Sequence, residues 1–215
     1  MTTPDVAVID YGIGNLLSVR RGLEHCGATV AVTADPAVIH SAPRVVLPGV
    51  GAFADGMAGL KGVGLDSVVR EVAARGVPLL GICLGMQMLL DESEEFGHTA
   101  GLGLIEGRVV AVPASDIEGR AQKIPHIGWN ALVPGGEAIS WRGTLLQEVA
   151  RGEAVYFVHS FMASPSNPAH RLADCLYGGV RVSAAIRRDN VFGCQIHPEK
   201  SGLVGLKILK TFLAG

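Results

Sequence analysis

One cysteine of the chain lies in a pattern that can make it a nucleophile. Residues 81–85 read Gly-Ile-Cys-Leu-Gly, and they separate an apolar run from a helical pattern. This Gly-x-Cys-x-Gly spacing is typical of a nucleophile elbow, whose glycines permit a tight strand-to-helix turn. A helix that begins near Leu84 would favour the Cys83 thiolate through its dipole, and the Leu84 N–H could bind an oxyanion. The alternative is a buried structural cysteine, an interpretation that suits Cys26, Cys175 and Cys194.

A cysteine nucleophile needs a base, and His197 is the strongest of the seven histidines. It follows an apolar strand pattern at 191–196 and precedes Pro198 and Glu199. Pro198 disfavours a helical conformation at His197, and residues two apart on an extended chain face the same side. Glu199 could therefore orient the His197 ring as the third member of a catalytic triad. The alternative is a solvated histidine beside a surface glutamate.

A second glycine-rich segment follows the apolar run at 45–47. Gly49, Val50 and Gly51 could turn their backbone N–H groups toward a ligand and complete an oxyanion site with Leu84. The pattern is weak by itself, because strand-to-helix turns often contain glycine.

The elements that must position these residues follow from apolar periodicity. Uninterrupted apolar runs indicate strands buried on both faces, at 6–9, 29–32, 45–47 and 79–82. Helical patterns at 15–26 and 65–75 alternate with them, which predicts an α/β fold with a mostly parallel central sheet and helices on both faces. Ligands of such sheets bind beyond the carboxyl ends of the strands, where the loops after Ile9, Leu47 and Ile82 should converge.

The second half of the chain has a different pattern. Closely spaced strand candidates predict an antiparallel extension, and they lie at 108–112, 154–158, 172–176, 182–186 and 192–196. A final helix is expected at 203–213, and the polar segment 115–122 matches no known motif. The 215 residues suit a single domain, 1–215.

Composition excludes several classes of function. The net charge is -2 and no segment concentrates Lys or Arg, so we expect no nucleic-acid partner. The four cysteines form no Cys-x-x-Cys pair, so neither a zinc site nor a disulfide framework is expected. The amino terminus lacks the basic region of a signal peptide, and the longest apolar stretch, 77–90, is too short to span a membrane. These features predict a cytoplasmic protein that binds no membrane.

Six segments together resemble the class I (triad-type) glutamine amidotransferase family. Within that family they resemble the glutaminase subunits of imidazole glycerol phosphate synthase, an enzyme of histidine biosynthesis. The segments are 10–16 (Asp-Tyr-Gly-Ile-Gly-Asn-Leu), 47–53 (Leu-Pro-Gly-Val-Gly-Ala-Phe), 81–87 (Gly-Ile-Cys-Leu-Gly-Met-Gln), 125–130 (Pro-His-Ile-Gly-Trp-Asn), 156–161 (Tyr-Phe-Val-His-Ser-Phe) and 195–201 (Gln-Ile-His-Pro-Glu-Lys-Ser). The resemblance covers nearly the whole chain and implies a flavodoxin-like fold.

The resemblance implies a reaction that needs no cofactor. Cys83 would attack the side-chain amide of glutamine, release ammonia and form a thioester, which water cleaves to glutamate. His197 would move the protons, and the Gly51 and Leu84 amides would hold the oxyanion. The implied substrate contacts are Gln87, His159, Ser160 and Phe161. On pattern alone, His159 could instead be an ordinary strand residue that hydrogen-bonds the backbone.

The resemblance also implies a partner. Family members deliver ammonia to a cyclase subunit with a (β/α)8 barrel, which makes imidazole glycerol phosphate and an aminoimidazole carboxamide ribotide. Such a barrel needs about 250 residues by itself, so it must be a separate chain. Implied interface positions are Asn15, Trp129, Tyr156 and Lys200, although Trp129 could be a core aromatic and Lys200 a solvated charge. Isolated, the chain is expected to have low activity, because a Gly49–Gly51 peptide could turn its N–H away until the partner docks.

One position departs from the family, and three alternatives stay open. Ile196 replaces a residue that is often aromatic in relatives, with no expected effect on catalysis. The chain could serve another synthase, for anthranilate, pyridoxal phosphate or a purine, although segments 47–53 and 125–130 favour the imidazole glycerol phosphate system. It could be a non-catalytic module of the same fold, or a cysteine peptidase or esterase.

Overall fold

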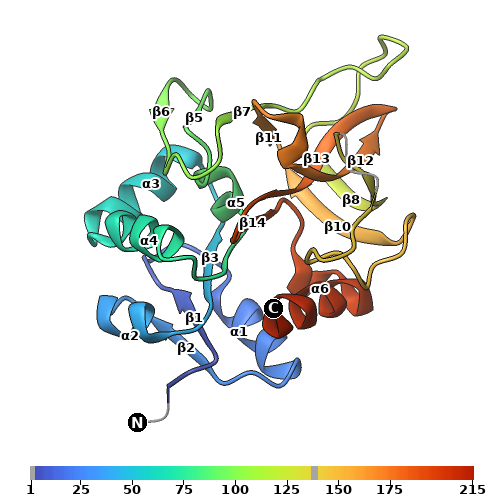
Figure 1. Cartoon of the computed structure of the whole chain (residues 1–215). Helices are drawn as coiled ribbons and strands as arrows, with labels where there is room; N and C mark the ends of the chain where they lie inside the picture. The colour runs from blue at the N-terminus through green and yellow to red at the C-terminus, as the bar shows by residue number, and fades with distance from the viewer. Residues whose placement is uncertain (1–2, 137–139) are drawn as a thin grey trace.

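An eight-stranded mixed sheet forms the centre of the molecule in the computed structural model, which describes residues 3–136 and 140–215 (Figure 1). Its strand order is β2-β1-β3-β4-β14-β13-β12-β9. The first five of these strands are parallel, and they are β2 (Val30–Thr33), β1 (Val6–Ile9), β3 (Val45–Gly49), β4 (Leu79–Cys83) and β14 (Val191–Cys194). The last three continue the sheet in antiparallel fashion, and they are β13 (Val180–Arg188), β12 (Arg171–Tyr177) and β9 (Val133–Pro134).

Helices cover both faces of this sheet, because successive residues of each buried strand point to opposite sides. One core combines Val6, Val8 and Leu80 with apolar residues of α1 (Leu16–His25) and α6 (Gly202–Ala214). The other combines the alternate strand residues with the opposite helices, which are α2 (Pro36–Ser41), α3 (Phe53–Gly62), α4 (Leu65–Ala74) and α5 (Leu84–Met88). The predicted fold, a mostly parallel sheet between two helical layers, is therefore confirmed.

The antiparallel strands of the second half are divided among three sheets. Three of the five predicted strands, those at 172–176, 182–186 and 192–196, correspond to β12, β13 and β14 of the central sheet. The strand predicted at 154–158 is β10 (Ala154–His159), which pairs with β8 (His126–Ala131). The strand predicted at 108–112 is β7 (Gly107–Ala111), which lies in a sheet with β11 (Phe161–Pro165), β5 (Glu92–Ser93) and β6 (Thr99–Ala100). Within the described residues, the remaining elements are two 3-10 turns, η1 (Pro168–His170) and η2 (Pro198–Lys200). The strand predicted at 192–196 ends early, at Cys194, so Gln195 and Ile196 lie beyond it.

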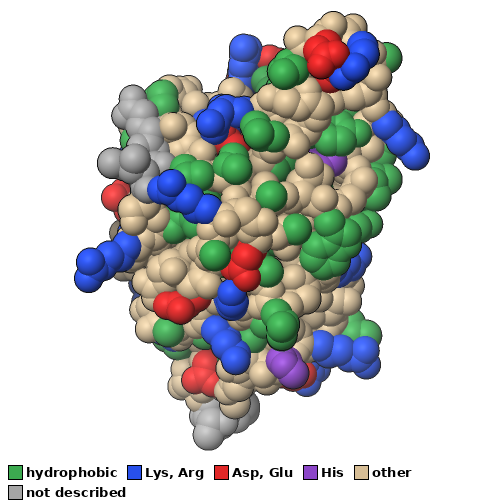
Figure 2. All heavy atoms as spheres, turned by 90° about the vertical axis from the view of Figure 1, so that its right-hand side faces the viewer, with side chains coloured by type: hydrophobic (Ala, Val, Ile, Leu, Met, Phe, Trp, Pro, Cys, Tyr) green, Lys and Arg blue, Asp and Glu red, His purple; other side chains and the backbone are tan. Residues whose placement is uncertain are grey.

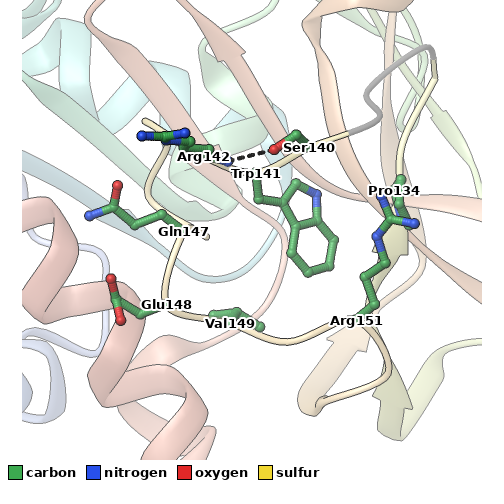
Figure 3. A pocket seen from close by; sticks show the side chains of 8 residues that line it. All are labelled: Pro134, Ser140, Trp141, Arg142, Gln147, Glu148, Val149 and Arg151. Carbon is green, nitrogen blue, oxygen red and sulfur yellow. Dashed lines mark hydrogen bonds between the residues drawn. The ribbon is translucent and has the colours of Figure 1, made fainter.

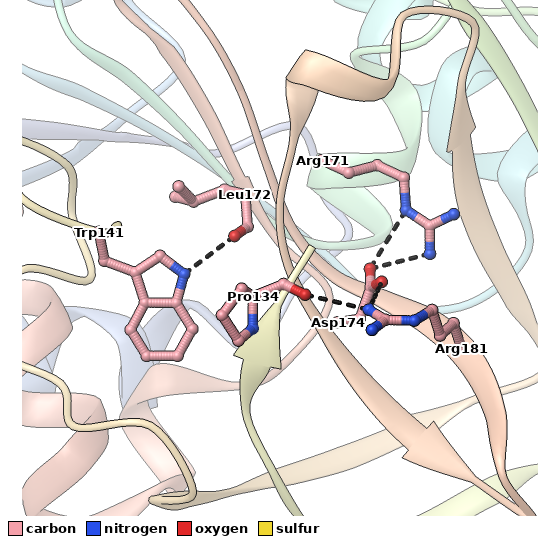
Figure 4. A network of polar contacts seen from close by, with 6 residues as sticks. All are labelled: Pro134, Trp141, Arg171, Leu172, Asp174 and Arg181. Carbon is pink, nitrogen blue, oxygen red and sulfur yellow. Dashed lines mark hydrogen bonds and ion pairs between the residues drawn. The ribbon is translucent and has the colours of Figure 1, made fainter. Parts of the chain in front are cut away.

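A buried carboxylate ties β9 and β12 to β13 (Figure 4). The Asp174 side chain is fully buried, and it accepts hydrogen bonds from Arg171 at 2.8 Å and from Arg181 at 3.1 Å. Arg181 also donates to the Pro134 carbonyl, and Trp141 donates to the Leu172 carbonyl. These bonds fix the outer end of the central sheet, next to the β8–β10 pair.

The segment 115–122 is an ordered turn. Asp116 accepts hydrogen bonds from the backbone N–H groups of Glu118 and Arg120, and Ser115 forms a bridge with Ala121. Among residues 3–136 and 140–215, none of the helices combines the length and hydrophobicity needed to cross a membrane.

Candidate active site

Cys83 lies at the carboxyl end of β4, on a strained turn into α5. Its φ of 55° and ψ of -112° are unusual for a residue with a side chain, and such strain is often found at functional sites. The flanking glycines serve close packing and not the turn itself. A Cβ on Gly85 would lie 1.9 Å from the Leu47 carbonyl oxygen, and a Cβ on Gly81 would lie 2.6 Å from the Gly85 oxygen. At the elbow, α5 therefore packs closely against β3 and β4.

His197 and Glu199 form an ion pair in the interior beside this elbow. His197 Nδ1 lies 2.8 Å from Glu199 Oε1, and the two side chains are 4% and 1% exposed. The prediction that His197 and Glu199 face the same side of an extended chain was wrong, because Glu199 lies in the 3-10 turn η2. His197 itself is extended, as expected before Pro198. The short turn brings the carboxylate back to the imidazole nitrogen.

Two histidines near Cys83 have opposite electrostatic environments. Burial lowers the pKa of His197, but its interactions with Cys83 and Glu199 outweigh burial and raise that pKa to about 9. Burial lowers the pKa of His159 to about 4 and outweighs the hydrogen bond to the Phe161 carbonyl, which raises it, while His126 and His197 also oppose a positive charge. Environments that separate two pKa values in this way make His197 the candidate acid–base group.

A cavity of about 340 Å³ opens over the Cys83 side chain. It brings together ten of the predicted site residues, which are Val50, Gly51, Cys83, Leu84, Gln87, His159, Ser160, Phe161, His197 and Lys200. Glu95 and Val158 complete the lining. Gly49 and Glu199 are absent from the wall. The cavity lies at the carboxyl ends of β3 and β4, where ligands of such sheets bind.

The two predicted oxyanion donors come from different segments. Leu84 is the first residue of α5, so its N–H has no partner within the helix. Gly51 has a φ of +97°, in an exposed loop where a Cβ would meet nothing within 4 Å. Gly49 is instead packed against the elbow, since a Cβ there would lie 2.8 Å from the Tyr11 hydroxyl. That hydroxyl donates to the Pro48 carbonyl at 2.8 Å and fixes the base of the loop.

The four predicted interface residues do not lie together. Trp129 and Tyr156 are opposite each other on β8 and β10, with ring centroids 6.0 Å apart. Lys200 lines the cavity, and the Asn15 amide lies 3.5 Å from Glu199 Oε1, the same oxygen that His197 contacts. Asn15 is thus placed as a neighbour of Glu199.

Three residues that have polar groups at the site were not identified from the sequence. Glu95 lines the cavity and accepts a hydrogen bond from the Phe53 N–H at the start of α3. The Gln195 side chain reaches the Cys83 sulfur at 3.8 Å. Ser201 donates to the His197 carbonyl and accepts from the Tyr156 N–H. Glu95 lies in the acidic run 92–95, which looks like an ordinary surface, whereas Gln195 lies two residues before His197 and period-two spacing could have indicated it.

A larger cavity elsewhere lacks comparable chemistry. About 450 Å³ lies between Pro134 and the segment that carries Ser140, Trp141, Arg142 and Val149, and Figure 3 shows the lining residues. That lining contains neither a cysteine nor a histidine. The parts of the chain that the structure describes also contain no cluster of His, Cys, Asp or Glu able to hold a metal ion. The Cys83 cavity is therefore the candidate active site.

A family model, Glutamine amidotransferase class-I, matches residues 7–214. The chain belongs to this family. The imidazole glycerol phosphate synthase subunit HisH 1 of Legionella pneumophila (strain Lens) is 54% identical over 97% of this chain and 98% of its own length. HisH of Moorella thermoacetica is 47% identical over 96% of this chain and 93% of its own length.

Solved structures share the fold of this chain at low sequence identity. A glutamine amidotransferase crystal structure has a TM-score of 0.72 and 17% identity, covering 98% of this chain and 97% of that chain. The structure of PurLQS from Thermotoga maritima has a TM-score of 0.71 and 18% identity, covering 99% of both chains. The predicted class I glutamine amidotransferase fold is thereby confirmed.

Proposed function

We propose that this chain is the glutaminase subunit of imidazole glycerol phosphate synthase and acts in histidine biosynthesis. The observation that carries the proposal is the position of Cys83, on a strained elbow in a cavity beside the buried His197–Glu199 pair. Relatives that share about half of their residues with this chain are named as subunits of this synthase, which supports the choice of synthase. Cys83, His197 and Glu199 are the proposed triad.

The reaction follows from the proton positions. With its raised pKa, His197 can take the proton that Cys83 gives up when its sulfur attacks. The sulfur attacks the amide carbon of glutamine, and the Gly51 and Leu84 N–H groups stabilise the oxyanion. His197 then protonates the leaving nitrogen, so ammonia departs and a thioester remains. His197 next accepts a proton from water, whose oxygen attacks the thioester and releases glutamate and the thiolate.

The charges of the cavity fit a free amino acid. Glu95 contributes a carboxylate and Lys200 a cation, which could bind the α-ammonium and α-carboxylate groups of glutamine. Gln87 contributes only its oxygen to a substrate, because its Nε2 donates to the Phe161 carbonyl and to Gln195 Oε1, both at 3.0 Å. This pairing of charges favours glutamine over a peptide, whose blocked termini could not use it.

The partner we propose is a separate (β/α)8 cyclase subunit that receives the ammonia. An apolar surface suited to a protein partner lies on β8 and β10, where Ile127 is 52% and Trp129 57% exposed. The register places Tyr156 opposite Trp129 and Val158 opposite Ile127. We call these four residues the hairpin face. Figure 2 shows hydrophobic side chains exposed in patches on the side of the molecule where Figure 1 places β8 and β10.

Transfer of labelled nitrogen tests the whole proposal. The chain would be mixed with the cyclase, its ribotide substrate and glutamine labelled with 15N in the side-chain amide. We expect 15N in the imidazole glycerol phosphate ring when free unlabelled ammonium is present in excess. Label that appears only in free ammonia would contradict the proposed partner. Absence of glutamate in the complete mixture would contradict the proposed reaction.

A further inference from the structure

A buried carboxamide reaches the Cys83 sulfur. Gln195 is fully buried just beyond the end of β14, and its Nε2 lies 3.8 Å from Cys83 Sγ. Contacts of this length are long for oxygen acceptors but fit the larger sulfur atom. Among the described residues, the groups that titrate or carry charge around this thiol are His197, with Glu199 behind it, and Tyr11, Glu95, His159 and Lys200.

The orientation of the Gln195 amide follows from its neighbour Gln87. Gln87 Nε2 lies 3.0 Å from the Phe161 carbonyl oxygen, which can only accept, so nitrogen must occupy that side of the amide. Its second hydrogen points to Gln195 Oε1, also at 3.0 Å. Gln195 must therefore present its oxygen to Gln87 and its N–H group to the sulfur.

The Phe161 carbonyl is itself held from a second side. His159 Nδ1 lies 2.8 Å from this oxygen, so it carries the proton and leaves Nε2 as an acceptor. His159 Nε2 faces Nδ1 of the fully buried His126 at 3.1 Å. The carbonyl that aims Gln87 is thus fixed by the β8–β10 pair. His159 and Gln87 both donate to it, and from Gln87 the hydrogen bonds run through Gln195 to Cys83.

We propose that Gln195 is a catalytic residue that donates its N–H to the Cys83 thiolate, and that Gln87 is the positioning residue that aims it. The inference extends the proposed glutaminase function. A hydrogen bond to a charged acceptor is stronger than one to a neutral acceptor, so the donor stabilises thiolate relative to thiol. It acts twice in a turnover, when the thiolate is formed for attack and when sulfur leaves the thioester as thiolate.

Alkylation of Cys83 measures thiolate without using glutamine. The full-length Gln195→Met variant keeps the side-chain length and removes the N–H donor. Iodoacetamide labelling of the Cys83 peptide, followed by mass spectrometry from pH 5 to 10, should show the half-maximal rate moved upward by about one pH unit. With the cyclase bound, kcat for glutamate formation should fall about tenfold while KM stays within about twofold.

Two further variants separate this role from packing. Gln195→Asn keeps an amide but shortens its reach, and it should shift the alkylation profile in the same direction, which covers the case in which the Met variant does not fold. Gln87→Leu frees the Gln195 amide and should give a smaller upward shift.

Asn190→Leu is the matched control, since the Asn190 amide precedes the other end of β14 and donates to the Ala73 and Val77 carbonyls. It should lower the melting temperature and leave the alkylation profile unchanged. Folded Gln195→Met and Gln195→Asn proteins with the native profile would overturn the proposal. A shifted profile in a protein that never hydrolyses glutamine would refute only the proposed function.

Discussion

At the scale of single residues, the site combines two histidines, His197 and His159, whose surroundings shift their pKa values in opposite directions. His197 faces a carboxylate and a thiol, which raise its pKa to about 9, whereas burial lowers the pKa of His159 to about 4. Of these two histidines, His197 is therefore the one that can carry, near neutral pH, the proton that the leaving amine needs in the proposed reaction. The sequence identified both histidines, but only the structure shows what each ring contacts.

Glu199→Gln should lower activity and narrow its pH range. His197 acts as an acid only below its pKa, so native activity should fall as pH rises through about 9. Loss of the Glu199 charge removes one of the interactions that oppose burial, so the alkaline limb of the kcat profile should move to lower pH. We expect kcat at pH 8 to fall about 100-fold. A native alkaline limb in this variant would contradict the role of Glu199.

Glu95→Gln should weaken substrate binding and leave chemistry largely intact. Glutamine at this position still accepts the bond from the Phe53 N–H but cannot neutralise the α-ammonium group. We expect KM for glutamine to rise about tenfold with little change in kcat, measured as glutamate formation with the cyclase bound. A fall in kcat at unchanged KM would show that Glu95 does not bind the substrate.

At the scale of elements, close backbone packing positions Cys83, the proposed nucleophile. The parallel half of the sheet was predictable, because strands buried on both faces give continuous apolar runs such as 45–47 and 79–82. The division of the antiparallel strands among three sheets was not, since alternation shows that a strand exists but not which neighbour it pairs with. The approach of α5 to β3 was indicated only by the presence of Gly81 and Gly85.

Gly85→Ala should destabilise the fold at the elbow. The new methyl group would lie 1.9 Å from the Leu47 carbonyl oxygen, a backbone atom held within β3. We expect the free energy of unfolding to fall by about 3 kcal/mol or more in denaturant titration, with loss of glutaminase activity. Gly62→Ala is the control, because a Cβ there meets nothing within 4 Å, and it should change stability by less than about 1 kcal/mol. Equal stability of the two variants would contradict this packing.

At the scale of the whole molecule, the hairpin face and the active site share two strands. β8 turns Ile127 and Trp129 outward while its alternate residue His126 is buried against His159, a residue of the cavity wall. On β10, the Tyr156 carbonyl accepts from the His197 N–H at 3.3 Å. A partner bound on the hairpin face would therefore contact the two strands that position His159 and His197. Low activity of the chain alone stays a prediction.

Trp129→Glu should weaken cyclase binding without unfolding the chain. A carboxylate in the centre of an apolar interface is costly to desolvate, so Kd measured by calorimetry should rise at least about 100-fold. Val63→Glu is the control, because Val63 is similarly exposed, at 51%, but follows α3 far from β8. Its Kd should match that of the native chain. An equal Kd for both variants would show that the hairpin face is not the interface.

The most direct test of a cysteine glutaminase is glutamate release by the Cys83→Ala protein in complex with the cyclase and its ribotide. The native complex should turn over glutamine through a thioester that acid quenching traps on the Cys83 peptide. The Cys83→Ala complex should assemble normally, release no glutamate above background and still make product when ammonium salts are supplied. Glutamate release by Cys83→Ala at the native rate would contradict the account.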